Sequence, residues 1–195
     1  MTRVEKVLHE VAGALSAAGQ RFAVVGGLAV SARAEPRFTR DVDLAVAVRD
    51  DSEAEALVHY LVNAGYSVLA TMEQDATKRL ATVRLLPPGE STNGVVADLL
   101  FASSGVEPDL VAAAERIEIL PGLTIPVALV GHLMALKVLA AAPERPQDLA
   151  DLRALAAVAD TADLELARQA LASIEARGFA RGKRLLEEFE RLTHR

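Results

Sequence analysis

Two aspartates spaced two residues apart are the first side chains whose types and spacing could do chemistry. Asp41 and Asp43 begin an alternating run that continues to Val48, and alternation of this kind predicts a strand. Residues two apart share one face of a strand, so the two carboxylates should lie roughly 6–7 Å apart. Because such neighbours repel each other unless a cation lies between them, the pair indicates a site for a divalent metal. An edge strand with two solvated acids is the alternative.

A third acid and a pair of glycines could complete this site. Asp98 lies inside the apolar run from Val95 to Phe101, where an unpaired charge would be costly to bury. Gly26 and Gly27 stand between a β-branched run and a small-residue segment, where free amides at a helix N-terminus bind phosphate oxygens; an ordinary turn is the alternative. Three carboxylates beside a phosphate-binding turn would make a two-metal phosphoryl-transfer site, since Mg²⁺ prefers oxygen ligands.

Cations near these acids have both a functional and a plain structural explanation. Arg37 and Arg40 flank the predicted carboxylate strand, where they could steer phosphates or pair with the acids themselves. Lys137 is one cation within an apolar helical segment, and a lysine whose ammonium extends to solvent is the alternative. Asp148 follows Pro146 in the first turn of a predicted helix, where an acid also favours the helix dipole.

Composition excludes several classes of protein. The 195 residues are 51% hydrophobic and 25% charged, which is typical of a globular chain long enough to bury a core. No cysteine is present, so disulfides, thiolate zinc sites and cysteine nucleophiles are excluded. The net charge of −6 argues against nucleic-acid binding through global basicity, although not against a local basic patch. We find no signal-peptide core and no run of about 18 apolar residues, and therefore expect a cytoplasmic protein.

The elements that must position these residues are strands and helices in front and helices behind. Apolar residues from Val4 to Leu15 have helical spacing that ends at Gly19, and Ser52 and Glu55 form a capping box. Strands are predicted at about 21–25, 41–48, 66–71, 80–86 and 95–101, a hairpin at 117–125, and further helices at 28–34, 129–141, 146–158, 163–178 and 180–192. This order predicts an α/β (α+β) fold, with a core of residues 1–126 and a helical extension of residues 127–195 that packs on it.

The spacing of the motifs resembles that of a known superfamily. Residues 25–27 and 41–44, VGG and DVDL, fit the pattern hG[GS]x9–13Dh[DE]h of the nucleotidyltransferases that include DNA polymerase β and CCA-adding enzymes. The local form RFTRDVDL at 37–44 most resembles the AbiEii/MenT-like bacterial toxin nucleotidyltransferases. Residues 133–137 and 145–152 are similar to the LxxLK…R…DxxDL segment of that group, so the similarity extends over about residues 20–155.

The resemblance implies a polymerase β-like nucleotidyltransferase core with a small mixed sheet, followed by a helical bundle. It also implies a Mg²⁺-dependent transfer of NMP from an NTP to an acceptor hydroxyl, with release of pyrophosphate. Two metal ions would be held by Asp41, Asp43 and Asp98, of which Asp98 could also act as the base. The nucleotide would be bound or its site supported by Gly26, Gly27, Arg37, Arg40, Lys137 and Asp148.

The resembled group also implies partners. Its members are toxins of toxin–antitoxin pairs, so we expect RNA, such as the tRNA 3′ end, as acceptor and an antitoxin protein as partner. Three alternatives stay open: a small-molecule enzyme of the aminoglycoside type, an enzyme that AMPylates a protein, and a nucleotide-binding module without turnover. The sequence departs from the group at Gly27, where many relatives have serine, and at Gly131-His132, which replaces an acidic dipeptide.

Overall fold

One mixed sheet carries the residues singled out above. The structure is a computed structural model that describes residues 2–91 and 93–193. The sheet has the strand order β3-β4-β5-β2-β1-β7-β6. Its strands are β1 (Phe22–Val24), β2 (Val42–Val46), β3 (Ser67–Glu73), β4 (Leu80–Leu86), β5 (Ala97–Leu100), β6 (Glu115–Leu120) and β7 (Leu123–Val127). The predicted strands and hairpin are thus present, and the predicted α/β fold class is confirmed.

The register of the three central strands aligns charged residues in one row. β2 pairs parallel with β5, with Asp43 opposite Asp98. β5 pairs antiparallel with β4, with Asp98 opposite Arg84. Because β2 lies between β5 and β1, the alternative of an edge strand with solvated acids is wrong. The strand begins at Val42, so Asp41 lies just before it and not within it as the alternation predicted.

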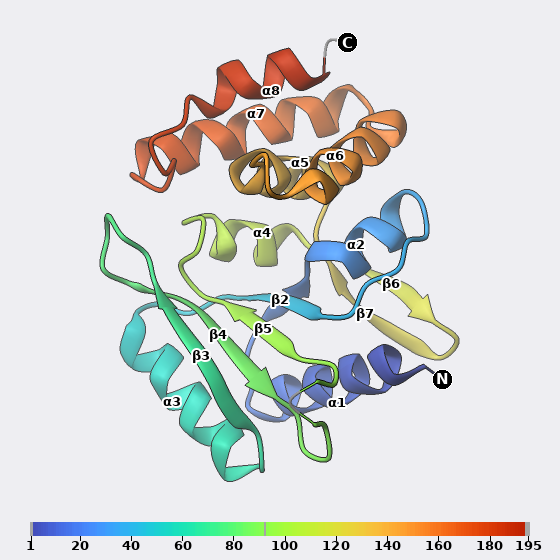
Figure 1. Ribbon diagram of the computed structural model, residues 1–195, viewed down its shortest axis with the longest axis vertical. Coiled ribbons are helices and arrows are strands. Elements are labelled where there is room, and N and C mark those ends of the chain that lie inside the picture. Colours follow the sequence, from blue (N-terminus) through green and yellow to red (C-terminus); the bar gives the residue numbers. More distant parts are fainter. Residues whose placement is uncertain (1, 92, 194–195) are drawn as a thin grey trace.

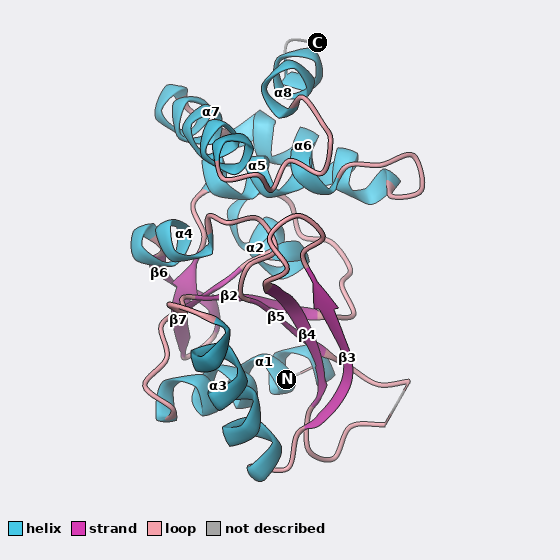
Figure 2. Ribbon diagram, turned by 90° about the vertical axis from the view of Figure 1, so that its left-hand side faces the viewer, coloured by secondary structure: helices cyan, strands magenta, loops and turns pink. Residues whose placement is uncertain are grey.

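Helices cover both faces of the sheet, as Figures 1 and 2 show. α1 (Arg3–Ala17) and α3 (Asp51–Asn63) lie on one face, while α2 (Gly26–Arg33) and α4 (Glu107–Ala113) lie on the other. The apolar residues of β2 explain this arrangement, because Leu44 and Ala45 point to opposite faces of the sheet and both are buried. α4 was not predicted from the sequence.

The C-terminal helices form a second layer above α2 and α4 (Figure 1). They are α5 (Val130–Ala140), α6 (Pro146–Val158), α7 (Thr161–Ala176) and α8 (Leu185–Thr193). α5 is buried along most of its length among the other three helices. A Cβ atom at Gly131 would collide with the backbone of Asp163 in α7, so the departure at Gly131 has a packing reason. The division into residues 1–126 and 127–195 stays a prediction.

Two helix starts differ from those predicted. α3 is capped by Asp50, whose side chain accepts from the Glu53 amide, and not by Ser52. α7 is capped by Asp160, which forms a capping box with Asp163. In both cases an acid two or three residues earlier in the chain supplies the capping oxygen, since aspartate caps as well as serine does. No helix of the described residues is long and apolar enough to cross a membrane.

Candidate active site

The centre of the site is the pair of carboxylates on β2 and β5. Asp98 is only 8% exposed, and Asp43 is half-buried opposite it. The backbone amide of Val25 donates to the Asp43 carbonyl oxygen at 2.9 Å, which fixes the glycine turn beside this strand. A Cβ atom at Gly26 would collide with the Asp43 carboxylate. Glycine is therefore required there because the carboxylate lies directly against the turn.

The surroundings of Asp43 disfavour its ionised form. The pKa of Asp43 is raised from 3.8 to about 6, first by burial and also by the charges of Asp98 and Asp41. The charge of Lys137 and a hydrogen bond from the Gly27 amide oppose this shift. A carboxyl group with a pKa shifted in this way is a candidate for a functional site. The negative charge here is not fully compensated by the protein.

Arg84 is a residue of the candidate site that the sequence reasoning missed. Its Nε donates to Asp98 Oδ1 at 2.8 Å and its Nη2 to Oδ2 at 2.7 Å. The hydrogen bond to Asp98 raises the pKa of Arg84, and the charges of Asp98, Asp41 and Asp43 do so as well. The signal that could have found it is the one that identified Asp98, since Arg84 is a lone charge in the apolar run LATVRLL.

The acids do not form a ready-made metal site. Within residues 2–91 and 93–193, no three histidine or acidic side chains are grouped closely enough to hold a metal ion. Asp41 lies at the rim of the same cleft as Asp43 and Asp98, but both oxygens of Asp98 are bound to Arg84. The oxygen donors nevertheless fit a hard cation such as Mg²⁺. The under-compensated charge of Asp43 supports the same fit.

Lys137 lies in a buried network of ion pairs between α5 and α6. Its Nζ is 2.9 Å from Asp148 Oδ1 and 2.7 Å from Asp151 Oδ2. Arg145 Nε pairs with the other oxygen of Asp148 at 2.7 Å. Since Lys137 is only 9% exposed, the alternative of a lysine that extends to solvent is wrong. The same residue lines the clefts at the carboxylates.

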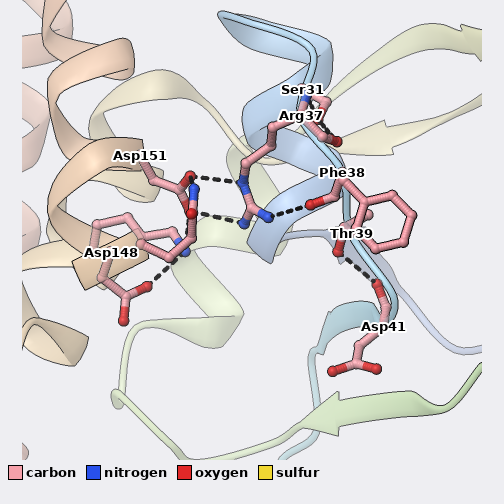
Figure 3. Close-up of polar contacts among 9 residues, drawn as sticks. Ser31, Arg37, Phe38, Thr39, Asp41, Asp148 and Asp151 are labelled. Atoms are coloured by element: carbon pink, nitrogen blue, oxygen red, sulfur yellow. Dashed lines mark hydrogen bonds and ion pairs between the residues drawn. The ribbon is translucent and has the colours of Figure 1, made fainter. Parts of the chain in front are cut away.

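The two predicted arginines have different surroundings. Arg37 pairs with Asp151, Nε to Oδ1 at 2.7 Å and Nη2 to Oδ2 at 2.9 Å, as Figure 3 shows. It therefore pairs with an acid of α6 and not with Asp41 or Asp43. Arg40 lies with its guanidinium carbon 5.7 Å from the centre of the Phe38 ring. Both arginines line the cleft at the carboxylates.

Gly27 also has a packing role. A Cβ atom there would lie 2.6 Å from Arg37 Nη2 and 2.8 Å from Thr39 Oγ1. A serine, as in many relatives, would need these side chains to move. The N-cap residue of α2, Val25, makes no side-chain cap, so the first amides of this helix are not bound by a capping side chain. The Gly27 amide is bound to the Asp43 carboxylate, and the N-terminus of the helix as a whole favours an anion.

Two clefts meet at the carboxylates. One, which we call the leucine cleft, has a volume of about 370 Å³ and is lined by Gly26, Asp43 and Asp98 together with Leu100, Leu133 and Leu136. The other, which we call the Phe38 cleft, has a volume of about 560 Å³ and is lined by Gly27, Phe38, Arg40 and Asp41. Asp43, Arg84, Asp98 and Lys137 line both. A third hollow of about 450 Å³ between α1 and the β6–β7 hairpin contains none of these residues.

Known proteins resemble this chain in sequence and in fold. The family described as "Nucleotidyl transferase AbiEii toxin, Type IV TA system" matches residues 11–194. No curated protein matches the sequence. The structure is similar to an antigenic nucleotidyltransferase-like protein from Paracoccidioides brasiliensis, with a TM-score of 0.57 and 18% identity over 99% of this chain and 97% of that one.

A second solved structure has a similar fold. It is ANT(2″)-Ia in complex with adenylyl-2″-tobramycin, with a TM-score of 0.55 and 14% identity over 88% of this chain and 97% of that one. At identities this low, the likeness shows the fold alone. Both neighbours are covered almost completely, so the helical layer is included in the shared fold.

Proposed function

The chain belongs to the AbiEii family of nucleotidyltransferases, and from this premise we propose that it moves NMP from an NTP to an RNA acceptor in a metal-dependent reaction. Nucleotidyl transfer itself is supported by the family and by the fold. The single observation that carries the finer proposal is the row of Asp43, Asp98 and Arg84 across three strands. This row faces both clefts, so two substrates can meet at the carboxylates.

The proposal gives each residue of the site a role. Gly26 and Gly27 bind the phosphates through the amides at the start of α2, and Lys137 neutralises part of their charge. Asp148 and Asp151 hold the Lys137 ammonium in place through the 2.9 Å and 2.7 Å ion pairs. Positioning and electrostatic stabilisation then supply most of the rate.

Asp41, Asp43 and Asp98 are the residues that would hold Mg²⁺. When bound, the ions would activate the attacking hydroxyl and neutralise the pyrophosphate that leaves. Asp98 could take the proton of the attacking hydroxyl only after Arg84 releases one of its two oxygens. Arg84 therefore belongs to the proposed machinery, as a cation that the incoming phosphates can attract.

Partners follow from the same proposal. The family is described as the toxin of a toxin–antitoxin system, which supports an antitoxin protein as a partner of this chain. We place its action in the cytoplasm, where NTPs and tRNA are available. RNA, and the tRNA 3′ end in particular, is the acceptor that we propose.

Labelling with each NTP tests the proposal. The protein is incubated with one α-labelled NTP at a time, Mg²⁺ and total RNA, and in parallel with an aminoglycoside or with total protein. We expect label on tRNA, pyrophosphate release, and loss of both with EDTA or in Asp43→Asn. Label on the aminoglycoside or on protein alone would contradict an RNA acceptor. NTP binding without any pyrophosphate release would contradict turnover.

A further inference from the structure

An aromatic ring stands exposed at the mouth of the proposed active site. The Phe38 residue is 78% exposed, whereas the other exposed large hydrophobic residues of the described chain reach at most 49%. It lines the Phe38 cleft together with Asp41 and Arg40. A phenylalanine in water forgoes the favourable burial of its ring. This ring is therefore the most prominent apolar contact available to a molecule that enters the cleft.

The segment that carries Phe38 is held in place. The Arg37 backbone amide donates to the Ser31 hydroxyl at 3.2 Å. Arg37 Nη1 donates to the Phe38 carbonyl oxygen at 3.0 Å. The Thr39 hydroxyl lies 3.4 Å from the Asp41 carbonyl oxygen. Figure 3 shows these contacts and shows the Phe38 ring turned away from Asp148 and Asp151. The backbone that carries the ring is thus held in place by its neighbours.

Arg40 adds a cation to the ring. Its guanidinium carbon is 5.7 Å from the ring centre, within the range of a cation–π contact. An aromatic face combined with arginine is the pair of groups with which proteins bind single-stranded nucleic acid, since every base has a π-face. A sugar-based acceptor such as an aminoglycoside has no such face. The chemistry at the rim therefore favours a nucleobase.

The two clefts indicate which substrate this base belongs to. The leucine cleft is the smaller one by volume and has the apolar walls Leu100, Leu133 and Leu136 beside Lys137, which suit the base and phosphates of a single NTP. The Phe38 cleft has the larger volume and is lined by an exposed ring, which suits the end of a longer molecule. Both clefts reach Asp43 and Asp98, where transfer would take place.

We propose that Phe38, supported by Arg40, is the stacking platform for the 3′-terminal base of a single-stranded RNA acceptor. This inference rests on the proposed function and names the acceptor subsite of that reaction. The terminal base stacks on the ring, and its ribose hydroxyl is then directed toward Asp43 and Asp98. Because stacking is tolerant of sequence, the platform selects a free 3′ end and not a particular base.

The test uses an RNA oligonucleotide whose 3′-terminal base is the fluorescent 2-aminopurine. Phe38→Ala should weaken the binding of this RNA about tenfold or more and relieve the quenching of the fluorophore. Phe38→Trp should retain both the RNA affinity and the quenching. That range corresponds to the usual cost of losing one stacked base. The KM for NTP should not change in Phe38→Ala. Tyr60→Ala is the matched control, since Tyr60 is an aromatic residue of α3 that is 43% exposed and lines neither cleft.

Several results would overturn the inference. Equal RNA binding by Phe38→Ala and the wild type would do so, provided that circular dichroism shows the variant folded. A raised KM for NTP with unchanged RNA binding would instead assign the ring to the nucleotide. Quenching that depends on Phe38 in a protein that transfers nothing would leave the platform standing and refute the proposed function. Transfer to RNA that is unaffected by Phe38→Ala would refute the stacking platform and leave the proposed function standing.

Discussion

At the scale of single residues, the charge of Asp43 lowers the stability of the free protein and would serve to bind a metal ion. It is half-buried, its carboxylate lies beside Asp98 and Asp41, and burial together with those charges disfavours its ionised form. A residue kept in such a position is typical of an active site, where function opposes stability. The charge that makes Asp43 unfavourable in the free protein is the charge that a metal ion would use.

We therefore expect Asp43→Asn to be more stable than the wild type and inactive. Removing the carboxylate charge abolishes the cost of burying it and its repulsion from Asp98, and the free energy of unfolding at pH 7 should rise by about 1–2 kcal/mol. Urea denaturation in EDTA measures this change. Asp75→Asn, at an exposed position, serves as the control and should leave stability within about 0.5 kcal/mol. A destabilised Asp43→Asn would refute this explanation.

Arg84 has the opposite charge and is expected to compete with a metal ion. Since it binds both oxygens of Asp98, Arg84→Gln should raise the affinity of the nucleotide-free protein for Mn²⁺ about tenfold. Electron paramagnetic resonance of free Mn²⁺ measures the binding. Arg79→Gln, which removes the ion pair between the residue before β4 and Asp51 of α3, should not change the Mn²⁺ affinity. Unchanged or weaker Mn²⁺ binding in Arg84→Gln would contradict a competition between the two cations.

At the scale of elements, helix packing explains the departure of Gly131 from the family pattern. α5 and α7 approach each other so closely that a Cβ atom at this position would collide with the Asp163 backbone and the Leu166 side chain. An acidic residue would need a wider separation of the two helices. The small residue thus holds α5, and with it Lys137, at its observed distance from the rest of the bundle.

Gly131→Ala should therefore destabilise the protein, by about 1–3 kcal/mol, because backbone atoms of α7 must move. The matched substitution is Gly13→Ala in α1, where nothing lies within 4 Å of the added atom. This one should stabilise the protein by about 0.5–1 kcal/mol, as alanine is the better helix former. Thermal unfolding of both variants makes the comparison. Equal effects of the two substitutions would show that helix propensity, and not packing, determines the change in stability.

At the scale of the whole molecule, one ionic network joins the front of the chain to the helical layer. Arg37, in the loop before β2, pairs with Asp151 of α6, which also binds Lys137 of α5. Although burial opposes it, hydrogen bonds from Lys137, Gln147 and Arg37 hold the pKa of Asp151 below its usual value. Both the leucine cleft and the Phe38 cleft lie between the two parts that this network connects.

We expect Asp151→Asn to lower the free energy of unfolding at pH 7 by about 3 kcal/mol, because two cations lose a buried partner. A carboxyl group whose pKa is lowered on folding stabilises above its unfolded pKa of about 4. That contribution is lost as the pH falls through the lower folded value, so the two proteins should converge in acid. Denaturation curves between pH 7 and pH 3 measure this.

The control for this prediction is Asp109→Asn. Asp109 pairs with Arg177 at 2.7 Å, but both side chains are about half exposed, so the loss should be at most about 1 kcal/mol. A similar cost for both substitutions would mean that the Asp151 network contributes no more than a surface pair. Such a result would also remove the structural link between the two parts of the chain.

Local patterns in the sequence were sufficient for much of the fold and part of the site. Alternation placed the β2 strand, a lone acid in an apolar run identified Asp98, and helical spacing identified α5 and α6. The resemblance to the AbiEii group, confirmed by the family match over residues 11–194, rested on the same short segments. These features depend on neighbours within a few residues, which the sequence displays directly.

What only the tertiary structure decided is which charges meet. The partner of Asp98 depends on the register of β4 against β5, and the partner of Arg37 lies 114 positions later in the chain. Caps shifted to Asp50 and Asp160, and Phe38 proved to be exposed. Spacing alone carries no information about such contacts, because charge pairing is set by the packing of distant elements. The sequence thus determined the kinds of groups in the site, while the packing of sheet and helices decided how they are joined.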